Sequence, residues 1–254
     1  MYVRIQFVVR NKIMSKHSHW AKIKHGKGAT DAKRGMIFTK LGRAITIAAK
    51  EKGPNPEFNF KLRLAIEAAR SANMPRENIE RAILRATGSE DSASLEELLY
   101  EGVLPGGVGV IIEVTSDNKN RTTGEIKKIL SEYGGTFAAA GAVRWNFSRL
   151  GVLEIKLPLL DSKLREEIEF RAIEAGAEDI KIEDDTMFIY IKPDELERVK
   201  SILEKDNIKI DFAGLEWLAR DKVSPDAETR SKLDKLFEAL DESEEVGEYY
   251  TNLS

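Results

Sequence analysis

The chain has 254 residues, of which 42% are hydrophobic and 33% charged, and it contains no cysteine. This composition indicates a soluble globular protein of two or three domains. It excludes disulfides, thiolate metal sites and thiol catalysis. No apolar run approaches the ~20 residues that span a bilayer, so we expect no membrane contact.

The net charge of −3 hides a strong asymmetry along the chain. Residues 15–88 carry 16 basic and 6 acidic side chains, a net charge of +10, and residues 1–14 add +3. Residues 89–254 carry 21 basic and 37 acidic side chains, a net charge of −16. This asymmetry is typical of a polyanion-binding segment joined to an acidic body, although the two parts could also neutralise each other across an internal interface.

Residues 1–14 are expected to be a disordered leader, because their apolar patch is too short for a secretory signal and Met14 would itself serve as a start. Residues 15–88 are predicted to form a basic helical domain of three helices. In the first helix an apolar stripe lies opposite Lys33, Lys40, Arg43 and Lys50, which gives the helix a core face and a basic face. We expect the helices at Thr30–Lys52, Glu57–Ala72 and Pro75–Gly88.

After Gly88 strand pairs alternate with amphipathic helices, which predicts an α+β fold with antiparallel sheets. We expect one α+β domain made of residues 89–135 plus 208–240, and a second one, 136–207, inserted into it. Residues 241–254 are expected to be a frayed acidic tail. The expected strands are Glu97–Leu104, Val108–Thr115, Val143–Phe147, Val152–Leu157, Asp179–Glu183, Met187–Ile191 and Ile208–Ala219, and the expected helices are Thr122–Tyr133, Asp161–Ala175, Asp194–Lys205 and Asp226–Leu240.

The basic segment predicts nucleic-acid binding, because its cations are too many to pair with Asp31, the one acid between Ser15 and Lys50. Lysine predominates, which favours contact with the phosphate backbone over reading of bases. Trp20 is available to stack on a base, although it could instead anchor the segment to the helices. Three clustered histidines could suggest a metal site, but the surrounding positive charge opposes it. The candidate contact residues are Lys16, His17, Trp20, Lys22, Lys24, His25, Lys27, Lys33, Arg34, Lys40 and Arg43.

A second candidate contact is the loop Asp117–Arg121 between a strand and a helix. Asn118, Asn120 and Arg121 could bind phosphate or RNA at the helix N-terminus. The alternative is purely local, with the Asp and Asn side chains forming turns and capping the helix.

Nothing in the sequence indicates an enzyme or a cofactor. Gly106-Gly107 lacks the Lys and Ser/Thr of a phosphate-binding loop, so nucleotide hydrolysis is unsupported. Glu101, Glu113 and Asp117 could gather at one sheet edge as in a metal-dependent nuclease, but no base or nucleophile accompanies them.

Many short motifs, in their order and spacing, resemble the YebC family (also called YebC/PmpR), and the resemblance covers nearly everything after Met14. These motifs are His17-Ser18, Trp20–His25, Ala32–Gly35, Phe38–Leu41, Arg63–Ile66, Ala72–Pro75, Asn78–Ile83, Tyr100–Gly102, Pro105–Gly107, Asp117–Thr122, Gly134-Gly135 and Trp145.

The resemblance implies three domains, with the last inserted into the second, a cytoplasmic location and no enzymatic activity. It also implies either of two functions. The first is a DNA-binding transcriptional regulator whose acidic domains recruit protein partners or self-associate. The second is a ribosome-associated translation factor that binds ribosomal RNA through the same basic segment, as mitochondrial relatives act as translational activators. A structural adaptor whose charged parts dock internally is a third possibility, and the oligomeric state is left open.

Overall fold

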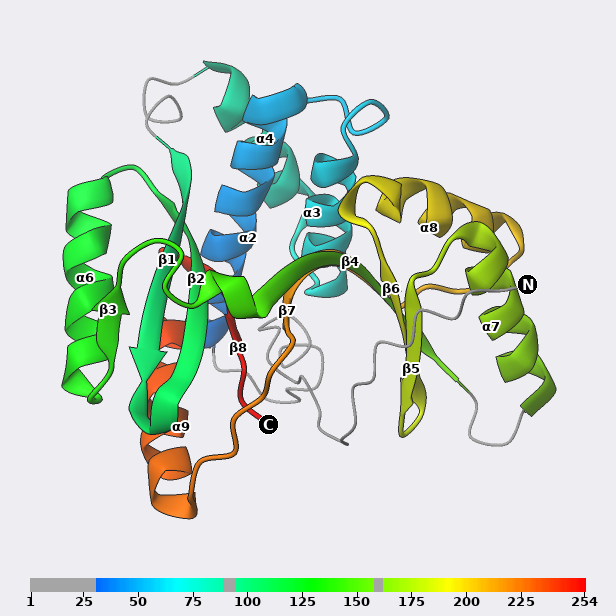
Figure 1. The fold of residues 1–254 in the computed structure, drawn as a ribbon. Coiled ribbons are helices and arrows are strands. Elements are labelled where there is room, and N and C mark those ends of the chain that lie inside the picture. Colours follow the sequence, from blue (N-terminus) through cyan, green and yellow to red (C-terminus); the bar gives the residue numbers. More distant parts are fainter. Residues whose placement is uncertain (1–30, 89–94, 158–161) are drawn as a thin grey trace.

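The structure is a computed structural model, and it describes residues 31–88, 95–157 and 162–254. The fold is mixed α+β, as predicted, with a helical N-terminal unit followed by two units that are each built on a four-stranded antiparallel sheet (Figure 1).

The N-terminal unit is a bundle of helices joined through Asn59. This side chain is fully buried, and its Oδ1 caps the second helix by accepting the N–H of Leu62. Its amide nitrogen donates to the carbonyls of Ala48 and Gly53, so it also satisfies carbonyls at the end of the first helix. The helices are α2 (Asp31–Lys52), α3 (Phe60–Ser71) and α4 (Arg76–Gly88).

The first sheet has the strand order β3-β1-β2-β8. The helices α6 and α9 pack on it, and their apolar faces form one core with the strands. Gly106 and Gly107, in the turn between β1 and β2, both have positive φ, which glycine adopts without strain. The elements are β1 (Glu96–Leu104), β2 (Val108–Ser116), α6 (Lys119–Glu132), β3 (Thr136–Ala138), α9 (Ala227–Glu242) and β8 (Val246–Thr251).

The second sheet has the strand order β5-β6-β4-β7. The helices α7 and α8 cover it and share a second core with its strands. The elements are β4 (Phe147–Lys156), α7 (Ser162–Ala175), β5 (Asp179–Glu183), β6 (Thr186–Ile191), α8 (Leu196–Lys205) and β7 (Phe212–Ala219).

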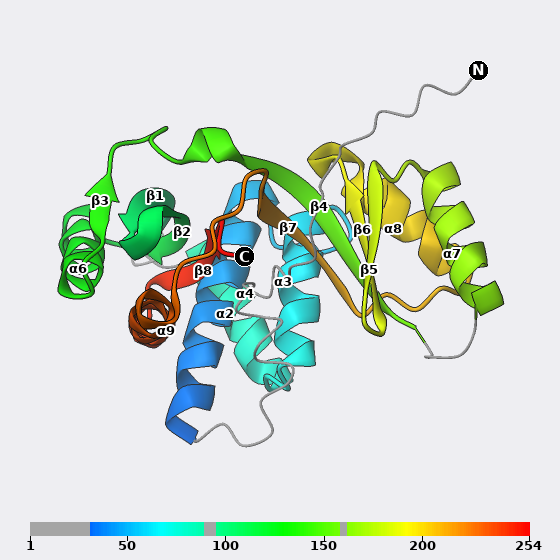
Figure 2. The same ribbon diagram turned by 60° about the horizontal axis from the view of Figure 1, so that its bottom comes forward.

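Figure 2 shows the two sheet units on either side of the helical unit, with the long strands β4 and β7 running between them. Ile111 and Tyr250 of the first sheet share a small core with Phe147 and Trp217 of the second. The helical unit contacts both of them, through α2 with β8 and α3 with β7. The three units are therefore packed against one another.

The predicted domain boundaries are wrong in two places. The strand expected at 208–219 was assigned to the first sheet, but β7 pairs with β4 over Phe147–Glu154 and belongs to the second. The expected insert also begins too early, because it includes β3, and β3 pairs with β1 of the first sheet. The inserted sheet therefore runs from Phe147 to Ala219.

The strand expected at Val143–Phe147 is a 3-10 turn over Arg144–Asn146, followed by β4. The turn forms because the backbone N–H groups of Val143 and Arg144 bind the carboxylate of Glu101, and are thus unavailable to a strand partner.

The expected frayed tail is also wrong. α9 continues to Glu242, and β8 then pairs with β2 as an edge strand of the first sheet. Tyr249, Tyr250 and Leu253 are buried, so apolar packing outweighs the local acidity of this segment. None of the helices within the described ranges is long and apolar enough to cross a membrane.

Candidate nucleic-acid interface

Four predicted contact residues lie on α2, and the structure divides them into two groups. Lys33 and Arg34, near the start of the helix, are exposed. Lys40 is only 5% exposed, and Arg43 is partly buried. Only the first part of the predicted basic face is therefore at the surface.

Lys40 docks the N-terminal unit onto the first sheet unit. Its Nζ donates to the carbonyl oxygen of Asp241 at 2.7 Å, in the last turn of α9, where carbonyls lack helical partners and the helix dipole favours a cation. Burial lowers the pKa of Lys40 to about 8, although the nearby carboxylates of Asp241, Glu248 and Glu244 oppose this shift. This placement gives Lys40 an interdomain contact, and its predicted contact with nucleic acid stays a prediction.

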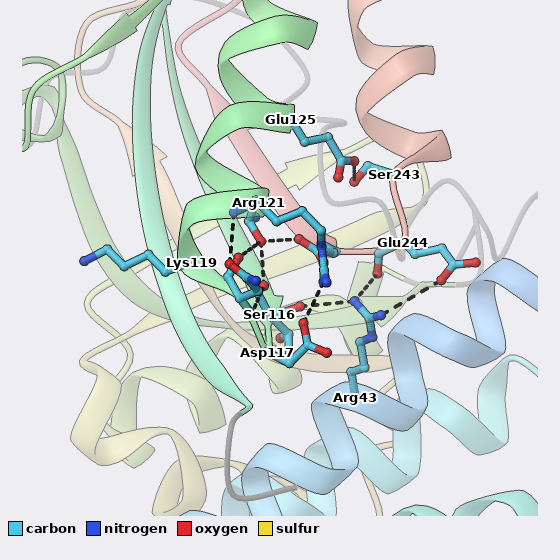
Figure 3. Close-up of polar contacts among 12 residues, drawn as sticks. Arg43, Ser116, Asp117, Lys119, Arg121, Glu125, Ser243 and Glu244 are labelled. Carbon is cyan, nitrogen blue, oxygen red and sulfur yellow. Dashed lines mark hydrogen bonds and ion pairs between the residues drawn. The ribbon is translucent and has the colours of Figure 1, made fainter. Parts of the chain in front are cut away.

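Arg43 has the same role one turn further along α2. Its Nη1 donates to the carbonyls of Thr115 and Glu244, each at 3.2 Å, and its Nη2 lies 3.9 Å from the Glu244 carboxylate (Figure 3). Lys50 likewise donates to the carbonyl of Leu95 at 3.1 Å. The predicted basic face of α2 is thus largely a docking surface, on which Arg43, like Lys40, makes interdomain contacts. Nucleic-acid binding by Arg43 stays a prediction.

Arg121, from the second predicted contact, lies next to this docking surface (Figure 3). Its Nη2 pairs with Asp117 at 2.6 Å and with the buried carboxylate of Glu245, and these contacts, led by that with Glu245, raise the pKa of Arg121. The hydroxyl of Thr122 donates to the same Glu245 carboxylate. A phosphate would have to compete with two carboxylates for this guanidinium.

Asn118 has the local role that was the alternative for this loop. Its Oδ1 accepts the N–H of Arg121 at 3.1 Å and so caps α6. Asn120 is exposed at the surface. Phosphate binding by Asn118, Asn120 and Arg121 stays a prediction.

The densest part of the predicted interface lies outside the described residues. Both interpretations of Trp20, and the metal alternative for the histidines, therefore stay predictions. In the described ranges no three His, Asp or Glu side chains are placed to hold a metal ion. The contact residues outside the described ranges are Lys16, His17, Trp20, Lys22, Lys24, His25 and Lys27.

Exposed arginines on α3 and α4 were missed as candidates. Arg70, Arg76, Arg81 and Arg85 are all exposed, and Arg76 pairs with Glu80 at 2.7 Å. Arg81 and Arg85 are four residues apart, so they lie on one side of α4. This spacing was the signal in the sequence that could have identified them.

The carboxylates considered for a nuclease do not gather. Glu101 accepts three backbone N–H groups, Glu113 accepts the indole N–H of Trp217 at 2.8 Å, and Asp117 pairs with Arg121. Each has a structural partner of its own.

Replacing Lys40 by Met is expected to leave the affinity for DNA unchanged within about twofold, because Nζ is buried against the end of α9 and donates to the carbonyl of Asp241. Titration of labelled duplex DNA with the purified Lys40→Met protein would measure this. A loss of tenfold or more, with an unchanged circular dichroism spectrum, would mean that the docked arrangement opens on DNA.

Two family models match consecutive parts of the chain. One, described as the TACO1/YebC protein N-terminal domain, matches residues 18–89. The other, described as the TACO1/YebC second and third domain, matches residues 95–253.

Similar proteins match over nearly their full lengths. A probable transcriptional regulatory protein of Persephonella marina is 46% identical over 242 residues, which are 94% of this chain and 95% of that protein. Its counterpart in Moorella thermoacetica is 45% identical over 241 residues, with the same coverage. The crystal structure of a conserved hypothetical protein from Aquifex aeolicus is 44% identical with a TM-score of 0.81, covering 93% of this chain and 97% of that one.

Proposed function

Because the chain belongs to the TACO1/YebC family, we propose that it is a DNA-binding transcriptional regulator that contacts phosphates through its basic N-terminal region. Relatives at 44–46% identity carry the name probable transcriptional regulatory protein, which supports regulation as the role. The contact itself is proposed from charge and exposure.

The observation that carries the proposal is that the docking contacts described above involve only some of the cations of the N-terminal region. Contacts with the other units use Lys40, Arg43 and Lys50, together with Lys61, which pairs with Glu97 at 2.7 Å. Arg63 pairs with Glu197 in the same way. Among the described residues, contacts with the other units thus involve these five cations, while residues 15–88 together carry +10.

The N-terminal region also carries cations that are exposed at the surface. Lys33 and Arg34 are exposed near the start of α2, and Arg81 and Arg85 are exposed on α4. Residues 15–30 add four lysines and no acid. Lys and Arg at such density bind duplex DNA by releasing condensed counterions, which makes the affinity depend steeply on salt.

Changing Lys22, Lys24 and Lys27 together to Glu is expected to weaken binding to duplex DNA by on the order of 100-fold or more at moderate salt, because three attractive phosphate contacts become repulsive. Fluorescence anisotropy across a salt series would measure both the affinity and its salt slope.

The matched control is Lys128/Lys205/Lys235→Glu, which makes the same change in charge on exposed positions of α6, α8 and α9. It should bind nearly as well as the parent. Equal losses in the two variants would show that only net charge matters and would sink the proposed interface.

Changing Arg81 and Arg85 to Ala is expected to weaken DNA binding about equally on all sequences and to reduce the salt slope by about two, as expected for two phosphate contacts. Both side chains are exposed, so the fold should be unaffected. An unchanged slope would remove α4 from the interface.

The same variants distinguish DNA from ribosomal RNA as the target. Sedimentation of cell lysate through a sucrose gradient would show whether the parent travels with ribosomes. If it does, and if Lys22/Lys24/Lys27→Glu does not, the basic region acts on the ribosome and the DNA proposal fails.

A further inference from the structure

A cavity of about 440 Å³ lies where the three units meet. Its walls come from α2 and α3, from β1, β2 and β8 of the first sheet, and from β4 and β7 of the second. This volume is within the range of small-molecule sites, which often lie between domains.

Glu216 of β7 lines this cavity and is only 8% exposed. Its Oε1 is buried and accepts no hydrogen bond within the structure described. A buried carboxylate oxygen normally has a donor, because burial without one is costly. A donor for this oxygen would have to come from a ligand, from water or from residues outside the described ranges.

The basic side chains of the cavity wall are engaged elsewhere. Lys40 donates to the carbonyl of Asp241, and Lys61 pairs with Glu51 and Glu97. Arg149 lies 3.9 Å from the Glu113 carboxylate and over the ring of Trp217. Arg144, the remaining basic residue of the wall, lies over the ring of Trp217. None of these contacts involves Glu216, so its carboxylate has no basic partner among them.

The wall of the cavity also contains aromatic residues. Phe212 and Tyr250 line the cavity, whereas the ring of Trp217 is already covered by the guanidinium groups of Arg144 and Arg149. Aromatic rings next to a carboxylate favour ammonium and guanidinium groups. We propose that this cavity binds a small organic cation, an alkylammonium or guanidinium compound, with Glu216 as the carboxylate that receives its N–H groups.

The pH dependence of binding follows from the groups around Glu216. Burial, followed by the negative charges of Glu154 on β4 and Glu113 on β2, raises its pKa to about 8, and Tyr190 of β6 and Tyr250 of β8 also face it. The cation binds the ionised form, so its affinity should rise about tenfold per pH unit up to about pH 8 and then level off.

Isothermal titration calorimetry of the full chain with agmatine and with putrescine tests the proposal at pH 6, 7 and 9. The parent should bind at least one of the two probes, with an affinity at least tenfold higher at pH 9 than at pH 6. Glu216→Gln keeps the shape of the side chain but cannot ionise, so it should lose binding at least tenfold at pH 9.

The matched control is Glu228→Gln, which removes an exposed carboxylate of α9 whose partner is Lys232. It should bind the probe as the parent does. Equal losses of affinity in the two variants would show that the probe binds to the acidic surface in general and not to Glu216. Absence of binding to the parent at pH 9 with millimolar probe would overturn the proposal. The pH series on the parent keeps the test decisive even if Glu216→Gln does not fold.

Discussion

Glu216→Gln is expected to stabilise the protein by on the order of 3–5 kcal/mol at pH 8.5, and by almost nothing near pH 4.5. Burial raises the pKa of Glu216 from 4.5 to about 8. Between these values the native chain binds a proton that the unfolded chain has released, so the parent loses stability as the pH rises from 4.5 to 8. Glutamine carries no such proton and avoids this loss.

Urea unfolding followed by circular dichroism at pH 5, 7 and 8.5 would give the free energy of unfolding of each protein. The informative quantity is the difference between variant and parent, because other groups titrate in both proteins alike. A difference that stays constant over this range would mean that Glu216 is ionised in the native state throughout.

Glu101→Gln is expected to destabilise the protein by about 2–4 kcal/mol at neutral pH, because a charged acceptor for several buried donors is lost. The carboxylate is 3% exposed and accepts the N–H of Gly141 at 2.6 Å, of Val143 at 2.8 Å and of Arg144 at 3.0 Å. In glutamine an amide NH₂ replaces one oxygen and would face at least one of these donors.

The contribution of Glu101 should also depend on pH. Burial acts to raise its pKa, but the three N–H groups together with the charge of Arg144 outweigh it, so the pKa of Glu101 lies below its ordinary value. The stabilisation is therefore complete above the ordinary value and is lost as the pH falls through the lower native one. Thermal melts of Glu101→Gln beside Glu96→Gln, an exposed control on the same strand, would measure it. Equal melting temperatures at pH 7 would contradict this role for Glu101.

Local patterns in the sequence predicted the helices and most strands of this fold. The apolar stripe of α2 and the buried runs of β2 and β4 are read from neighbouring residues alone. The two largest errors both concern pairing over long distances. β8 pairs with β2 from the far end of the chain, and β7 pairs with β4 across an intervening helix-and-hairpin segment. No local signal specifies such partners.

The candidate site shows the same limit. Periodicity correctly separated the core face of α2 from its basic face, but it could not reveal that α9 and β2 cover Lys40 and Arg43. The capping alternative for Asn118 was accessible because it involves residues three positions apart. The sequence could not predict which carboxylates are buried and how they are hydrogen-bonded. For Glu101 and Glu216, only the folded chain shows which donors lie near each one.

The docking of α2 also bears on how freely the two sides of this interface can change by mutation. Lys40, Arg43 and Lys50 direct hydrogen bonds to the main-chain carbonyls of Asp241, Thr115 and Leu95. Every amino acid presents such a carbonyl, so these three bonds survive any substitution at the acceptor positions that keeps the backbone in place. Substitution of a donor removes its bond. Substitutions should therefore be tolerated at the three acceptor positions and restricted at the three donor positions on α2, although both sides take part in the same contacts.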